Sequence, residues 1–290
     1  MPAKYLPIKR ISTRKFGYRN CLEWILVEKS YFKRVLSMCS KGELIYWWIL
    51  RALMIGGIVY RLINIDPKLG YYQPLQMSAN LVGMFAFEIC QMFPKKTYPR
   101  LFPSYFQNFT IIGFFLASFG GAFLNFYYLI PAYDKILHAY GCVEATIIGY
   151  ELITAMQIRD KKTCPANIAA LAAFGFAFIM ANGWELFEFV YDQWFGGDAQ
   201  HWNYYRALEE AAENNQKLFW LIPLDNFSEE DRILRFAIMD TMGDMILNVI
   251  GAVPTYIALR IRPYHHMGKN NVNKMIEEEL AKTAKETANV

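Results

Sequence analysis

Residues 167–191 read NIAALAAFGFAFIMANGWELFEFVY, an apolar run of 25 residues whose only charged side chains are Glu185 and Glu188. At a helical rise of about 1.5 Å per residue, about 20 such residues are enough to cross the hydrocarbon core of a bilayer. The whole chain has 290 residues, of which 54% are hydrophobic and 19% are charged. Soluble domains carry about 25% charged residues and do not repeat apolar runs of this length. The sequence therefore predicts an integral membrane protein.

Five further stretches have similar length and hydropathy, so the sequence predicts an all-α, polytopic membrane helix bundle with about six transmembrane helices. The expected spans are residues 44–63, 75–93, 108–130, 134–156, 167–191 and 237–259. They divide the chain into a basic arm at 1–43, a bundle at 44–259 and a polar tail at 260–290. Within the arm, residues 22–38 are expected to form an amphipathic helix, either on the inner leaflet or packed as an ordinary cytoplasmic helix.

Basic residues alternate between the connections, which indicates the orientation of the bundle. The arm 1–43 holds 10 Lys and Arg against 3 acids, and both 94–107 and 157–166 have an excess of positive charge. The long connection 192–236 has the opposite bias, with 9 acids and 4 basic residues. Because cytoplasmic loops are enriched in Lys and Arg, both termini are expected in the cytoplasm, on the inner side of the cell membrane. Residues 192–236 then form an external lid between the fifth and sixth helices.

Three of the predicted spans carry acids or a histidine at helical spacing. These residues are Asp134 and His138, Glu185 and Glu188, and Asp240 and Asp244. Spacings of three and four residues place each pair on one face of its helix. A charged side chain at bilayer depth costs about 3 kcal/mol, so such residues normally face a partner, an ion or water. In the expected orientation all six lie at the level of the outer leaflet. The sequence predicts one shared polar pocket there, with Asp134 and Asp240 at its rim.

The residue types suit a divalent cation, because neutral histidine and ionised carboxylates are both good metal ligands. The candidate ligands are His138, Glu185, Glu188, Asp240, Asp244 and Asp134, and the candidate catalytic residues are Glu185, Glu188 and Asp244. Without a cation, five carboxylates this close would repel one another, which metal ions, shared protons or basic partners could each relieve. Arg51 and Arg61 are possible counter-charges, and Arg61 is the better placed because it lies near the outer end of its helix.

Several of these residues form motifs that resemble known families. The run DKILH at 134–138 resembles the DK-x-x-H element of VanZ-like bacterial membrane proteins, and DMILNVIG at 244–251 resembles their D-x-x-x-N-x-x-G element. The run WELFE at 184–188, followed by Asp240-Thr241, is similar to the W-E-x-x-E and D-T elements of YjdF-like bacterial inner-membrane proteins. The resemblance covers residues 108–259. It implies a bacterial inner-membrane protein and supplies no substrate.

Three kinds of function fit this pattern. An enzyme would use a metal or the paired carboxylates on a lipid or lipid-linked envelope substrate at the outer leaflet. A proton- or cation-coupled transporter would use the acids as a relay, which Glu144 could extend inward towards Glu151. A non-catalytic scaffold would use the acids to clamp three helices while the arm or the lid binds a partner. Membrane lipids are expected partners and nucleic acid is not, and the sequence leaves the oligomeric state open.

Overall fold

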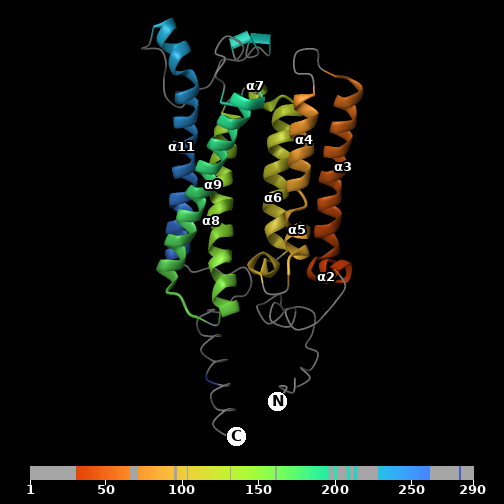
Figure 1. Ribbon diagram of the computed structural model, residues 1–290, viewed down its shortest axis with the longest axis vertical. Helices are drawn as coiled ribbons and strands as arrows, with labels where there is room; N and C mark the ends of the chain where they lie inside the picture. Colours follow the sequence, from red (N-terminus) through yellow and green to blue (C-terminus); the bar gives the residue numbers. More distant parts are fainter. Residues whose placement is uncertain are drawn as a thin grey trace.

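The computed structural model describes residues 31–65, 71–94, 97–102, 104–130, 132–160, 162–195, 199–200, 208–209, 212–213, 228–261 and 281. The regular structure of these residues is helical and includes no strand, which confirms the all-α prediction. Among the described residues, five helices are long and apolar enough to cross a membrane. The long helices stand side by side along the long axis of the molecule (Figure 1). Many large apolar side chains on their outer faces are exposed, as a lipid-facing surface requires.

The first spanning helix is α3, Lys41–Ile63, which starts three residues before the predicted span. Ser40 caps this helix, since its hydroxyl accepts a hydrogen bond from the Glu43 N–H at 3.1 Å. In return, the Ser40 N–H donates to Glu43 Oε2 at 2.8 Å, which completes a capping box. Before it lies α2, Tyr31–Met38. The rest of the amphipathic helix predicted at 22–38 lies outside the described residues.

The predicted second span, 75–93, is not one continuous helix. Two shorter helices take its place, α4 (Tyr72–Gly83) and α5 (Ala86–Met92). At the break between them, the Met84 carbonyl accepts hydrogen bonds from Arg51 Nε at 3.1 Å and Nη2 at 2.6 Å. Arg51 also forms an ion pair with Glu88 at 2.8 Å. Arg51 therefore pairs with a backbone carbonyl that has no regular helical partner at the break. Its positive charge is paired with Glu88 and does not reach the predicted outer pocket.

The predicted third span, 108–130, changes form along its length. After the 3₁₀ turn η1 (Tyr98–Leu101), the chain forms α6 (Tyr105–Phe115), the π-helix η2 (Leu116–Phe123) and the short α7 (Phe126–Leu129). Side chains from other segments reach the carbonyl groups of the π-helix. Arg61 Nη2 donates to the Phe123 carbonyl at 3.1 Å, and the Tyr133 hydroxyl donates to the Leu116 carbonyl at 3.0 Å. These side-chain bonds add to the backbone hydrogen bonds of the π-helix, which join residues five apart, as in Leu124 N–H to the Phe119 carbonyl at 3.0 Å.

The last three long helices pack together as a three-helix unit. They are α8 (Tyr133–Asp160), α9 (Ala166–Phe195) and α11 (Glu229–Ile261). α8 and α11 run in the same direction, and α9 runs in the opposite one (Figure 1). At Gly251 of α11, an added Cβ atom would lie 2.1 Å from the Ala139 carbonyl oxygen of α8. The missing side chain thus lets the two backbones touch, as small residues often do between membrane helices.

The described part of the predicted lid, 192–236, is anchored to the three-helix unit, and both α9 and α11 extend into this range. The Asp192 carboxylate accepts hydrogen bonds from the backbone N–H groups of Ala199 at 2.6 Å and Gln200 at 2.9 Å. The Gln200 side chain donates to Thr241 Oγ1 of α11 at 3.0 Å. The chain leaving α9 is therefore held against α11. Most of the predicted lid and nearly all of the predicted tail lie outside the described residues.

Candidate functional site

Residues from three helices meet at one level of the three-helix unit and form what we call the polar cluster. Its members are Asp134, Lys135 and His138 of α8, Glu185 of α9, and Asp240 and Asp244 of α11. The Asp240, Asp244 and Glu185 residues are 3%, 1% and 7% exposed. The convergence of these three helices agrees with the sequence prediction. The prediction that Asp240 lies at the rim is wrong, because Asp240 is buried against Lys135.

Lys135 lies at the centre of the polar cluster, although helical spacing did not predict it there. Its Nζ atom lies 2.7 Å from Asp240 Oδ1, 2.7 Å from Asp244 Oδ1 and 3.2 Å from Asp134 Oδ2. The lysine side chain is only 6% exposed. Arg61, the better placed of the two possible counter-charges, instead donates a hydrogen bond to the Phe123 carbonyl of η2.

The signal for Lys135 was present in the sequence, directly after Asp134. Helical phase excluded it, because successive residues on a helix with 3.6 residues per turn point about 100° apart. Lys135 therefore belongs to a different face of α8 from Asp134 and His138. Its four-carbon stem makes up this difference and carries the ammonium to the carboxylates of α11. The reach of a side chain, as well as its phase, decides whether a basic residue can join an acidic face.

His138 presents both of its ring nitrogens to carboxylates. Nε2 lies 3.6 Å from Asp134 Oδ1 and 3.6 Å from Asp244 Oδ1, and Nδ1 lies 3.6 Å from Glu185 Oε1. These separations are longer than hydrogen bonds. The ligand atoms of Asp134, His138 and Asp244 all lie within 4.8 Å of one another. In a tetrahedral site with metal–ligand bonds of about 2.1 Å, ligand atoms are about 3.4 Å apart, so small movements would let these three bind one cation.

Glu185 faces the second nitrogen of His138 from α9. Neither of its carboxylate oxygens has a hydrogen-bond partner among the residues that the structure describes. Buried polar groups are normally paired, so this carboxylate is unusual. A histidine that binds a metal usually turns its other nitrogen to a carboxylate or carbonyl, which orients the ring. The position of Glu185 suits this orienting role better than the role of direct ligand that was predicted from the sequence.

The charges of the polar cluster do not balance. Four carboxylates come from Asp134, Glu185, Asp240 and Asp244, and one ammonium comes from Lys135. With a neutral histidine and ionised acids, three negative charges remain uncompensated. In an apolar environment such an excess favours the uptake of a cation or of protons.

Two other polar residues border the cluster. Glu188, predicted as a ligand and catalytic residue, is not one of the three residues whose ligand atoms lie within 4.8 Å of one another. Its Oε1 accepts a hydrogen bond from Trp184 Nε1, one turn earlier on α9, at 2.7 Å. Asn248 of α11 is buried and its side chain interacts with His138. Glu188 and Asn248 therefore lie next to the candidate ligands without belonging to the group that could bind the ion.

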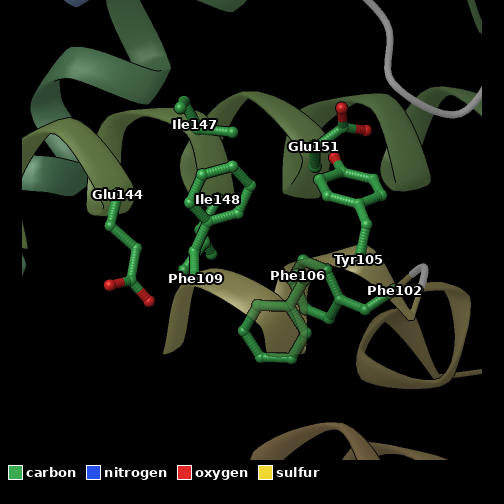
Figure 2. A pocket seen from close by; sticks show the side chains of 8 residues that line it. All are labelled: Phe102, Tyr105, Phe106, Phe109, Glu144, Ile147, Ile148 and Glu151. Atoms are coloured by element: carbon green, nitrogen blue, oxygen red, sulfur yellow. The ribbon is translucent and has the colours of Figure 1, made fainter. Parts of the chain in front are cut away.

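A separate pair of acids, Glu144 and Glu151, lies on the side of α8 that faces α6. Figure 2 shows the small cavity that these acids line together with Phe102, Tyr105, Phe106, Phe109, Ile147 and Ile148. Glu144 Oε1 accepts a hydrogen bond from Thr110 of α6 at 2.7 Å. Seven residues make nearly two helical turns, so both acids share one face, whereas His138 faces α9 and α11. The cavity is therefore distinct from the polar cluster.

Comparison with known proteins supports the membrane assignment. A family described as "Predicted membrane protein (DUF2238)" matches residues 46–264. This range contains the whole polar cluster. It also contains most of α3 and all of α4 and α5, which lay outside the motif resemblance at 108–259. Neither the curated proteins nor the solved structures gave a significant match. The chain therefore belongs to the DUF2238 family of predicted membrane proteins.

Proposed function

We propose that this membrane protein binds a divalent cation at Asp134, His138 and Asp244 and uses it to hydrolyse a lipid or lipid-linked substrate. The observation that carries the proposal is the placement of His138, whose Nε2 faces two carboxylates while Nδ1 faces Glu185, each at 3.6 Å. The uncompensated negative charge of the cluster favours the same occupant. Three protein ligands leave a coordination position for water or substrate, as in catalytic zinc sites. Carboxylate and imidazole ligands suit Zn²⁺ or Mn²⁺.

The proposed substrate class follows from the proposed depth of the site. With both termini in the cytoplasm, the polar cluster lies in the outer leaflet, where it can reach the ester and phosphoester groups of lipids. A bound divalent ion polarises such groups and supplies hydroxide near neutral pH. The motif resemblance to YjdF-like and VanZ-like proteins supports a bacterial cell membrane as the location.

Removal of the cation tests the proposal. We expect detergent-purified protein to contain one Zn²⁺ or Mn²⁺ per chain by elemental analysis. A chelator should remove this ion and lower the melting temperature by about 5 °C, because a ligand held at 100 times its Kd stabilises the folded state by about 2.7 kcal/mol. Protein that contains no metal, or whose melting temperature does not respond to the chelator, would contradict the proposal.

Two other functions have specific observations in their favour. Transport of protons or cations is favoured by Glu144 and Glu151, which place further acids along α8. In that case Glu144→Gln would slow ion uptake into proteoliposomes, whereas hydrolysis depends on the polar cluster alone. A purely structural clamp is favoured by the ion pairs of Lys135, which join α8 to α11. A clamp would leave the melting temperature insensitive to chelators.

The depth of the site rests on the orientation of the bundle, which we propose from the distribution of basic residues. The turn between α8 and α9 should face the cytoplasm, and the segment between α9 and α11 should be external. On a background without the native cysteines, we expect Glu209→Cys to react with a membrane-impermeant thiol reagent in intact cells. Lys162→Cys should react only after the cells are opened. Labelling of position 162 in intact cells would overturn the orientation and the proposed depth.

A further inference from the structure

We infer that the Lys135 ammonium occupies the second of two cation seats that share carboxylates, so that the protein binds one divalent ion beside its own lysine. This inference rests on the proposed function and adds the number of metal ions that the site accepts. The first position, which we call the metal seat, is formed by Asp134, His138 and Asp244. The second, which we call the lysine seat, is formed by Asp134, Asp240 and Asp244.

Two carboxylates belong to both seats. Asp134 turns Oδ2 to Lys135 Nζ at 3.2 Å and Oδ1 to His138 Nε2 at 3.6 Å. Asp244 offers Oδ1 to both groups, at 2.7 Å from Lys135 Nζ and 3.6 Å from His138 Nε2. Carboxylates shared in this way are able to bridge paired metal ions, which lie about 3.5–4 Å apart in two-metal enzymes. The geometry of the cluster is therefore that of two adjacent seats with bridging acids.

Lys135 fills its seat as a bound cation would. An ammonium has three donors and no acceptor, and three carboxylates lie within 3.2 Å of Nζ. Asp240 belongs to the lysine seat only, because it is not one of the metal-seat residues. The side chain of Lys135 is 6% exposed, so the carboxylates and not bulk water compensate most of its charge.

The charge balance agrees with two cations in these seats. The four carboxylates of the cluster carry four negative charges when ionised. One divalent ion together with Lys135 leaves one negative charge, and two divalent ions would leave none. Because the ammonium occupies the lysine seat, one seat remains for a metal ion, and a second ion should enter once the ammonium is removed.

The metal content of Lys135→Ala tests the inference. With Mn²⁺ as the probe, we expect one ion per chain in the wild type and two in Lys135→Ala. The two ions should give an exchange-coupled electron paramagnetic resonance spectrum through the shared acids. Lys135→Arg keeps the positive charge and should bind one ion. Mn²⁺ should also raise the melting temperature of Lys135→Ala more than that of the wild type, because it restores the lost counter-charge.

Removing a buried counter-charge can prevent folding, so Lys135→Met, which keeps the length of the stem, is measured in parallel, and both variants are purified with Mn²⁺. One ion in both the wild type and the folded variants would overturn the inference and leave the proposed function standing. No ion in the wild type and one in the variants would overturn the proposed function and the count of one ion, and would show only that the acids around Lys135 accept a cation in its place. No ion in any of these proteins would overturn both.

Discussion

Asp244→Asn is expected to abolish divalent-cation binding, with a loss of affinity on the order of 100-fold or more, while the helices stay inserted. Asp244 is 1% exposed and offers one oxygen to both His138 and Lys135. The amide keeps the shape of the side chain but removes the charge that a metal ligand needs. Replacing even an outer-shell partner of a metal ligand costs 10- to 100-fold in affinity, so a direct ligand should cost at least as much. Mn²⁺ titration of the purified variant measures the loss.

Two variants on α9 provide controls for this result. Glu188→Gln should lose the least affinity of the three variants, because Glu188 bonds to Trp184 and acts on the metal seat only through its charge. Glu185→Gln should fall between the two, with a loss of about 10- to 100-fold, because it would act on the ion through His138. Equal losses in Glu188→Gln and Asp244→Asn would show that the ligand set is wrong, even if a metal is bound.

Gly251→Val is expected to lower the free energy of unfolding by about 3 kcal/mol and the melting temperature by at least about 6 °C. The first added carbon would lie 2.1 Å from the Ala139 carbonyl oxygen. A backbone atom cannot turn aside as a flexible side chain can, so α8 and α11 must separate. Ala139 follows His138 directly in the chain, and the metal affinity should therefore fall as well. Thermal melting and Mn²⁺ titration of the same preparation measure both effects.

Gly175→Val is the matched control, because Gly175 is also a helical glycine of the three-helix unit. Apart from the adjacent backbone of its own helix, an added Cβ there would have no atom within 4 Å. The variant should melt within about 2 °C of the wild type, since the new side chain meets open space. If both valine variants melt alike, the contact between Gly251 and Ala139 does not hold the helices together.

The sequence predicted the three-helix unit well and the first half of the bundle less well. The span predicted at 134–156 is observed as Tyr133–Asp160, because one uninterrupted apolar run decides where such a helix lies. The break at Met84 was not predictable in the same way. It depends on a carbonyl that accepts hydrogen bonds from Arg51, 33 residues earlier in the chain. Hydropathy and periodicity are local properties and do not contain such long-range partners.

The candidate site shows the same division between local and long-range information. Helical spacing was sufficient to select His138, Glu185 and Asp244, because each lies on the inward face of its own helix. The same spacing could not show that Lys135 reaches α11, nor that Asp240 is drawn inward by it. Nor could spacing distinguish Glu185, which faces His138, from Glu188, which bonds to Trp184. These differences depend on how the three helices are rotated against one another.

The ion pairs of Lys135 also set an order of assembly for the chain. Its partners Asp240 and Asp244 lie 105 and 109 residues later in the sequence. α8 therefore leaves the ribosome and enters the membrane before α11 has been synthesised. In that interval the long lysine stem can hold its charge at the headgroups, as lysines near helix ends do. Once α11 has inserted, the ammonium can leave the lipid headgroups and form ion pairs with Asp240 and Asp244. Synthesis of the last helix is thus the event that closes the three-helix unit.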